Sequence, residues 1–104
     1  MHHTIVQEDG AVLLQLRGEL DAISCPELRP VLDALALQQG SAVTVDLSEL
    51  RLIDSSGVAA LVSLYKRVRA RGSAVRFVGV NAQPLAIFKL LRLDRAFEIA
   101  GDQL

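Results

Sequence analysis

The sequence has little of several residue types. Tryptophan is absent from its 104 residues, aromatic residues make up 4%, and Cys25 is the single cysteine. Without aromatic side chains there is no platform on which nucleic-acid bases would stack. The net charge of −1 is spread over mixed acidic and basic residues, so no basic stripe is present for a duplex. A lone cysteine forms no intramolecular disulfide and favours a reducing compartment. We therefore expect a cytoplasmic protein that binds no nucleic acid.

Long apolar runs are also absent. The longest runs span only a handful of residues, whereas a membrane-spanning helix needs about 20. The first residues, Met1 to Thr4, do not have the pattern of a signal peptide. Apolar residues nevertheless make up 51% of the chain, which is enough for a core without disulfides. We expect one domain, residues 1–104, without a membrane segment.

Short β-prone segments alternate with amphipathic helical ones. The Glu8-Asp9-Gly10 turn signal separates the first two strands and predicts a hairpin. Later strands that alternate with helices indicate parallel pairing with the second strand. The predicted strands cover residues 4–7, 11–16, 41–47 and 74–80, and the predicted helices cover 24–38, 56–71 and 81–91. The fold class is thus α/β, with a mixed sheet of four to five strands, an N-terminal hairpin and three to four helices.

The first predicted helix carries strong start signals. Ser24 and Glu27 have capping-box spacing, and Pro26 lies in the first turn. Pro30 removes a hydrogen bond in the second turn, so we expect a kink or a late start there.

Four further segments carry their own expectations. The strand at 41–47 is β-branched and apolar, as expected for a strand that is covered on both faces. Residues 48–54 are predicted to form a loop with inward-pointing Leu50, Leu52 and Ile53. Residues 97–99 are expected to form a short strand or to anchor a loop. The third helix is expected to be packed down by Leu85, Ile87, Phe88, Leu90 and Leu91.

The junction Asp54-Ser55-Ser56-Gly57 lies between a predicted strand and the most amphipathic helix. The buried face of this helix is predicted to contain Val58, Leu61, Val62, Tyr65 and Val68. Ser55 or Ser56 is then at or next to the helix N-cap, where a hydroxyl can satisfy a free backbone N–H. The junction is therefore either a cap alone or a phosphorylation site, since a helix N-terminus also tolerates a phosphate.

Enzymatic chemistry is poorly supported. The only histidines, His2 and His3, are next to the start of the chain, and neither the Gly-x-Ser-x-Gly pattern nor a phosphate-binding loop is present. Asp46, Glu49 and Asp54 are the nearest candidate metal ligands, but solvated loop acids are the simpler interpretation. An aspartyl-phosphate at Asp54 would need a second magnesium-binding acid, which is not evident. We expect no enzymatic activity, no cofactor and no metal.

Asp21 follows the second predicted strand. Because parallel strands end at the same edge of a sheet, Asp21 is predicted to lie near Ser55. An exposed turn acid is an equally good interpretation of the pattern alone.

The chain resembles the STAS domains of bacterial anti-sigma factor antagonists over nearly its whole length. The two segments that carry the resemblance best are Gly18-Glu19-Leu20-Asp21 and Asp54-Ser55-Ser56-Gly57, and their combination is more specific than either alone. Further segments that fit the family are Val45-Asp46-Leu47-Ser48, Arg71-Gly72, Val78-Gly79-Val80 and Leu90 to Phe97.

The resemblance implies a partner switch. The unphosphorylated domain would bind an anti-sigma factor that is also a serine kinase of the GHKL type, and the sigma factor would be released. The kinase would phosphorylate the first serine of the motif, here Ser55, and a phosphatase of the PP2C type would restore it. Asp21, Asp54, Ser56 and Gly57 match positions that line the partner-binding surface. Where many relatives have leucine and glycine after the motif, this chain has Val58 and Ala59, a difference that can tune which kinase fits.

A second resemblance is to STAS subunits of phospholipid-transport ABC complexes, notably around Val78 to Asn81. Such subunits usually have threonine after the aspartate, where this chain has Ser55. Genome context would separate these two functions.

Overall fold

A four-stranded mixed sheet forms the centre of the protein in the computed structural model, which describes residues 1–38 and 41–97. The strand order is β1 (His2–Glu8), β2 (Ala11–Leu20), β3 (Ala42–Ile53) and β4 (Val75–Val78). β1 is antiparallel to β2, whereas β2, β3 and β4 are parallel to one another. The predicted hairpin and the parallel pairing with the second strand are therefore confirmed.

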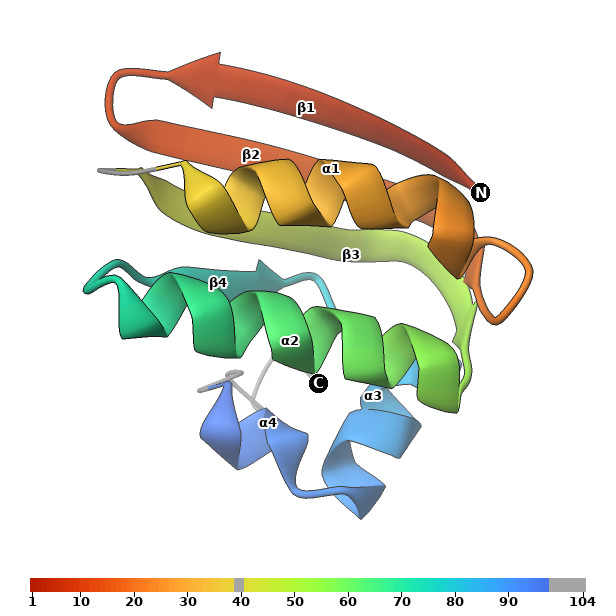
Figure 1. Ribbon diagram of the computed structural model, residues 1–104. Coiled ribbons are helices and arrows are strands. Elements are labelled where there is room, and N and C mark those ends of the chain that lie inside the picture. Colours follow the sequence, from red (N-terminus) through yellow and green to blue (C-terminus); the bar gives the residue numbers. More distant parts are fainter. Residues whose placement is uncertain (39–40, 98–104) are drawn as a thin grey trace.

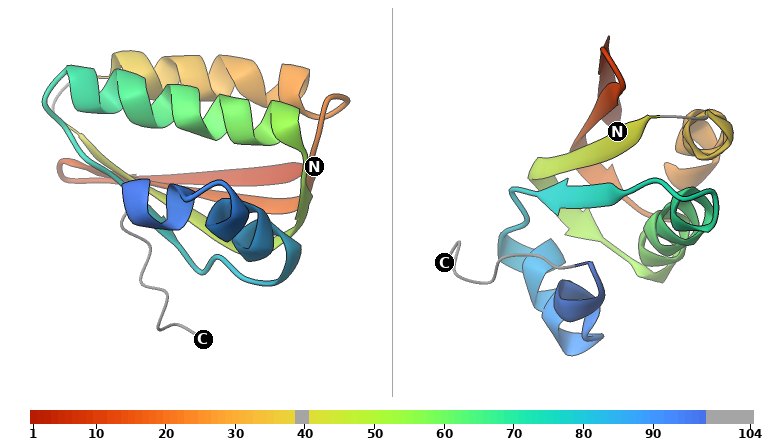
Figure 2. Two further views of the ribbon diagram at one scale, coloured as in Figure 1. Left: turned by 90° about the horizontal axis from the view of Figure 1, so that it is seen from below. Right: turned by 90° about the vertical axis from the view of Figure 1, so that its left-hand side faces the viewer.

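Helices cover one face of this sheet and one of its sides. α1 (Cys25–Leu37) and α2 (Ser55–Ala70) lie next to each other on the same face, as Figures 1 and 2 show. α3 (Ala82–Leu90) and the short α4 (Leu93–Ala96) lie on the side of β4. The α/β class and the mixed sheet agree with the sequence-based expectation, and the four described helices, including the four-residue α4, lie within the predicted three to four.

The core lies between the sheet and the α1–α2 layer. Alternate residues of β2 point into it, and Val12, Leu14 and Leu16 are fully buried. β3 contributes Val43 and Val45 opposite Val12 and Leu14 in the parallel register. From α2 the buried side chains are Val58, Leu61, Leu64 and Val68, while the predicted Val62 and Tyr65 are only partly buried. Burying such side chains stabilises the fold by roughly 1.5–3 kcal/mol each.

β2 and β3 are both longer than predicted. Residues 17–20 and 48–53, expected outside the strands, pair with each other through two shifts of register. Gly18 lies at one shift with φ of +101°, a conformation that favours glycine. The predicted loop at 48–54 is thus wrong. Leu50 and Ile53 do point inward, but Leu52 is exposed.

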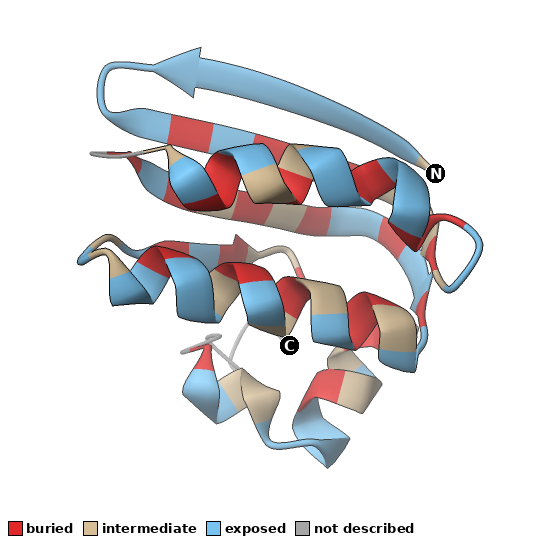
Figure 3. Cartoon of the chain, in the orientation of Figure 1, coloured by how far each residue is buried: buried red, intermediate tan, exposed pale blue. Residues whose placement is uncertain are grey.

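Only one face of β3 is covered by helices. Its buried residues alternate with intermediate or exposed ones, so the expectation of cover on both faces is also wrong. Figure 3 shows this alternation along β2 and β3 and the full exposure of β1.

The helix starts differ from the predictions in detail. α1 begins at Cys25 and continues through Pro30, so the late start is wrong. Its end at Leu37 agrees with the prediction, and Gly40 lies outside the described residues. In α3, Phe88 is buried, whereas Leu90 and Leu91 are exposed.

Phe97 anchors the end of the described chain. Its ring stacks on Phe77 at a centroid distance of 4.3 Å and lies 4.9 Å from the Tyr65 ring. This confirms its role as an anchor, while residues 98–99 lie outside the described part of the chain.

Candidate functional site

Two segments that are far apart in the sequence meet where β2 and β3 end. They are residues 21–24, which lead into α1, and residues 54–58, which begin α2, and we call them together the Asp54 corner. Asp54 joins the two segments. Its Oδ1 accepts a hydrogen bond from Gly57 N at 3.0 Å, and its Oδ2 accepts one from Ala22 N at 3.1 Å. Its own N–H donates to Leu20 O at 3.1 Å.

Asp54 is therefore the N-cap of α2. Its backbone is extended, and its carboxylate satisfies one of the free N–H groups of the first turn. The sequence predicted that Ser55 or Ser56 is at or next to the cap, and the capping side chain is that of the preceding aspartate. The cap is worth about 0.5–2 kcal/mol relative to alanine.

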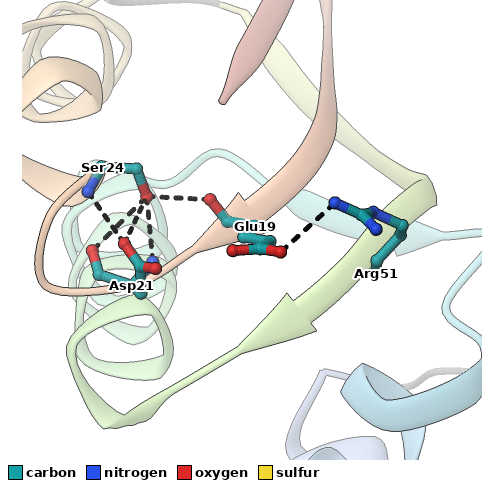
Figure 4. Close-up of polar contacts among 4 residues, drawn as sticks. All are labelled: Glu19, Asp21, Ser24 and Arg51. Atoms are coloured by element: carbon teal, nitrogen blue, oxygen red, sulfur yellow. Dashed lines mark hydrogen bonds and ion pairs between the residues drawn. The ribbon is translucent and has the colours of Figure 1, made fainter.

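Asp21 folds the other segment onto itself. Its Oδ1 accepts hydrogen bonds from Ile23 N at 3.0 Å and from Ser24 N at 2.9 Å. Figure 4 shows its contacts with Ser24 beside the exposed pair of Glu19 and Arg51. These hydrogen bonds, with the one from Ser24 N first, lower the pKa of the Asp21 carboxyl below its usual value of 3.8. Asp21 is thus held as a carboxylate by the loop that it organises.

Ser24 does not act as the predicted capping box. Its hydroxyl turns away from α1 and donates to Glu19 O at 2.8 Å, and it accepts from Asp21 N at 2.9 Å. The backbone of Ser24 is already helical, with φ of −85° and ψ of −25°. A cap residue normally has extended dihedrals and turns its oxygen to the following turn. Ser24 marks the helix start correctly but stabilises the loop before it.

Gly57 permits close contact between α2 and β2. A Cβ atom on Gly57 would lie 2.6 Å from Leu20 O and 2.7 Å from Ile53 Cγ1. No larger residue fits there without moving the helix or the strand. The next residue, Val58, is buried in the core. Gly57 and Val58 thus fix the start of α2 from inside.

The two serines have different surroundings. Ser55 is the first residue of α2 and is exposed, whereas Ser56 is half-buried. No acidic residue lies within the first turn of α2. Ser55 therefore presents its hydroxyl at the positive end of the helix dipole, next to the Asp54 cap.

Sequence reasoning missed two residues that shape this corner. Gln83 of α3 forms a pair of hydrogen bonds with the backbone of Ile53, accepting from its N–H at 2.9 Å and donating to its carbonyl at 3.0 Å. Ile23 has an 87% exposed side chain although Asp21 holds its N–H. Neither residue belongs to a local pattern that would have indicated its place.

A groove of about 340 Å³ runs between α1 and α2, starting at the corner. Cys25 and Ser56 lie at its corner end, and the ion pair of Arg67 with Asp33, at 2.8 Å, also borders it. Burial raises the pKa of the Cys25 thiol above 9.0, so the thiol is protonated at neutral pH. The groove therefore has no thiolate nucleophile.

Within residues 1–38 and 41–97, His, Cys, Asp and Glu side chains do not gather in groups of three or more that could hold a metal ion. Asp46, one of the candidate ligands, instead accepts a hydrogen bond from Ser48 N at 2.9 Å. None of the helices in these ranges has both the length and the apolar character that crossing a bilayer requires.

Comparison of the sequence with protein families gives one match across almost the whole chain. The family model described as "Mlab, STAS domain" matches residues 3–101. The anti-sigma-B factor antagonist of Listeria monocytogenes is 28% identical over 82 residues, which are 79% of this chain and 72% of that protein. The anti-sigma-B factor antagonist of Bacillus subtilis is 25% identical over 97 residues, covering 93% and 88% of the two chains.

Solved structures share the fold. The crystal structure of an anti-sigma factor antagonist from Mycobacterium paratuberculosis aligns with a TM-score of 0.84 at 21% identity, covering 98% of this chain and 88% of that one. The unphosphorylated form of SpoIIAA aligns with a TM-score of 0.70 at 17% identity, covering 91% and 97%. At these identities the likeness shows that the fold is the same.

Proposed function

Because the chain belongs to the STAS domain family, we propose that it is an anti-sigma factor antagonist that works by partner switching. Unphosphorylated, it binds an anti-sigma factor that is a GHKL-type serine kinase. Phosphorylation of Ser55 releases it, and a PP2C-type phosphatase reverses the modification. The names of the relatives in Listeria and Bacillus support the general function. The observation that carries the proposal for Ser55 is its exposure as the first residue of α2.

The chemistry of the Asp54 corner suits such a switch. A phosphate on Ser55 adds about −1.5 to −2 charges at a helix N-terminus, which tolerates them. The carboxylate of Asp54 already accepts the Gly57 N–H, so the cap does not need the phosphate. The new charge is therefore added to the outer surface, where it repels an acidic partner surface and must be desolvated on docking. The domain itself stays folded.

We assign the partner-binding surface to the Asp54 corner. Ser55 and Ser56 present hydroxyls, Asp21 and Asp54 present carboxylates, and Gly57 with Val58 sets the position of the helix. Because both carboxylates accept backbone hydrogen bonds within the chain, they keep the segments in place as well as presenting charge. Ile23 adds an exposed apolar side chain at the rim.

The test is incubation with ATP and a candidate GHKL-type anti-sigma kinase from the same organism, followed by intact-mass measurement and peptide mapping. We expect one phosphate on Ser55, none on S55A, and normal labelling of S56A as the matched control. Labelling of S55A would show that the site is wrong. If the kinase neither labels nor binds the wild-type protein, the function is wrong.

Binding measurements separate the switch from a structural role. S55A should bind the kinase permanently, and S55D should bind weakly with an unchanged melting temperature. A large fall in the melting temperature of S55D would instead identify Ser55 as structural.

A second candidate is the STAS subunit of a phospholipid-transport ABC complex. The description of the matching family model, which names Mlab, supports this second candidate. Co-purification with transporter subunits, in the absence of phosphorylation by any neighbouring kinase, would support this function over the first.

A further inference from the structure

The loop between β2 and α1 carries the most exposed of the large apolar side chains in the described residues. Ile23 is 87% exposed, whereas Leu90 and Leu37, the next in order, are 76% and 74% exposed. A single exposed apolar residue is common on protein surfaces and needs no explanation by itself. What distinguishes Ile23 is its place, because its loop is one of the two segments of the Asp54 corner. Figures 1 and 2 show this loop projecting from the end of the sheet at which α1 and α2 begin.

The backbone that carries Ile23 is held at every position of the loop. Each of the four N–H groups from Asp21 to Ser24 donates to a side-chain oxygen. Asp21 N donates to Ser24 Oγ at 2.9 Å, and Ala22 N donates to Asp54 Oδ2 at 3.1 Å. The N–H groups of Ile23 and Ser24 both donate to Asp21 Oδ1, at 3.0 and 2.9 Å. The loop is therefore fixed by the chain's own hydrogen bonds.

A fixed backbone lowers the cost of placing the Ile23 side chain in a partner's pocket. Binding usually removes conformational freedom from the loops and side chains at an interface. This loop has already lost that freedom on folding, and a β-branched side chain has few rotamers to lose. Ile23 thus has the properties of an anchor, which is an apolar side chain that is preorganised and that leaves water only on docking.

The other residues of the corner are constrained by the fold. The carboxylates of Asp21 and Asp54 accept backbone hydrogen bonds. Gly57 leaves no space for a larger residue, and Val58 is only 9% exposed. Ile23 is free of such constraints, because its side chain is almost fully exposed and only its backbone takes part in the loop. Its identity can therefore change without loss of stability, which is what a specificity-determining residue requires.

We propose that Ile23 is the apolar anchor by which the anti-sigma kinase recognises this chain, and that it inserts into an apolar pocket of that kinase beside the site that receives Ser55. The assignment rests on the function proposed above and names the contact that selects the partner. Asp21 and Asp54 position the loop, and Ile23 makes the contact. Val58, one of the two positions that the resemblance suggested for tuning the kinase, is buried, so it can act only through the position of α2.

Binding of the unphosphorylated chain to candidate GHKL-type anti-sigma kinases from the same organism tests this assignment. Calorimetric titration gives the dissociation constant for the kinase that phosphorylates the wild-type chain. Ile23→Ala should weaken binding by about 10- to 100-fold. Ile23→Asp should weaken it further, because a carboxylate would enter the apolar pocket unpaired. Ile23→Val keeps most of the apolar surface and should stay within about fivefold of the wild type.

Leu37→Ala, at the far end of α1, is the matched control and should bind as the wild type does. Melting curves of all variants should coincide with that of the wild type, because both side chains are mostly exposed. The rate of Ser55 phosphorylation gives a second readout. Because the anchor contributes equally to the ground state and the transition state, I23A should raise KM for the chain and leave kcat unchanged.

The outcomes separate the anchor from the proposed function. If I23A and I23D bind the kinase as tightly as the wild type does, the anchor is wrong and the proposed function stands. If none of the kinases binds or phosphorylates the wild-type chain, the proposed function fails and the anchor fails with it. A fall of kcat in I23A at unchanged KM would assign Ile23 to the alignment of Ser55 and overturn its role in recognition.

Discussion

The two long helices begin side by side at one end of the sheet but are stabilised differently. α2 begins after an extended Asp54 whose carboxylate caps the third residue, Gly57. α1 begins after a helical Ser24 whose hydroxyl bonds backward to Glu19. Pro26 in its first turn has no N–H that requires a partner. The segment before α1 is thus stabilised by its own side chains and by Asp54. At the start of α2, Asp54 stabilises both its own helix and the segment before α1.

The same contrast continues in the first residues. The first residue of α1, Cys25, is buried, and the first residue of α2, Ser55, is exposed. The third residue is the reverse, because Glu27 is exposed and Gly57 is buried. In α2 the first residue is exposed and the third residue, Gly57, provides the packing.

The largest effect is expected from Gly57→Ala. The added Cβ would lie 2.6 Å from Leu20 O and 2.7 Å from Ile53 Cγ1, so α2 or β2 must shift. We expect a loss of about 1–3 kcal/mol in the free energy of unfolding, measured with urea. Glu27→Ala changes the equivalent position of α1 and should stay within about 0.5 kcal/mol of wild type. Equal stability of both variants would show that the contact at Gly57 relaxes without cost.

Asp54→Ala should have the next largest effect. It removes the cap and the link to Ala22, and we expect a loss of about 1–2 kcal/mol in the free energy of unfolding. Asp54→Asn keeps one carbonyl acceptor and should lose less. Hydrogen exchange should quicken at the amides of Ala22 and Gly57 in the alanine variant. If only the Gly57 amide is affected, Asp54 acts as a cap and does not join the two segments.

Asp21 should make the free energy of unfolding depend on pH in the acidic range. Its pKa in the folded state lies below the unfolded value of 3.8. Its contribution is therefore fully present above about pH 4 and is lost as the pH falls through the lower, folded pKa. Asp21→Asn should remove this part of the pH dependence, which urea titrations between neutral and strongly acidic pH would measure. Identical slopes for both proteins below pH 4 would contradict the prediction.

The smallest effect is expected in the reactivity of the Cys25 thiol. A helix N-terminus usually lowers a thiol pKa, but burial raises that of Cys25, and the Coulombic effect of Asp54 acts in the same direction. We expect the folded protein to react with an aromatic disulfide reagent at pH 8 much more slowly than the urea-unfolded chain. Equal rates would show that the Cys25 thiol is as accessible in the folded protein as in the unfolded chain.

The sequence predicted those features that depend on local pattern. The strand at residues 11–16 and the hairpin turn before it appear as expected. The continuation of β2 and β3 was missed, because residues 17–20 and 48–53 become strands only by pairing with each other across two register shifts. Such pairing depends on tertiary contacts and leaves no local signal.

The site was predicted in part for the same reason. The sequence placed the Asp54-Ser55-Ser56-Gly57 junction at a helix start, and the structure has it there. It could not assign the cap to Asp54, because serine and aspartate are equally good cap residues. The link from Asp54 to Ala22 and the contact of Gln83 with Ile53 join residues far apart in the sequence. Only the folded chain brings them together.

The parallel pairing of β2 with β3 has a consequence for newly made protein. Leu14 can meet Val45 only after the whole of α1, which lies between them in the sequence, has been synthesised. Non-local strand pairing of this kind is slow compared with helix formation. The hydrogen bond between Ala22 N and Asp54 joins segments on either side of α1 and β3, so a short peptide around Ser55 lacks half of the surface. A partner that recognises both segments therefore distinguishes finished molecules from nascent or misfolded ones.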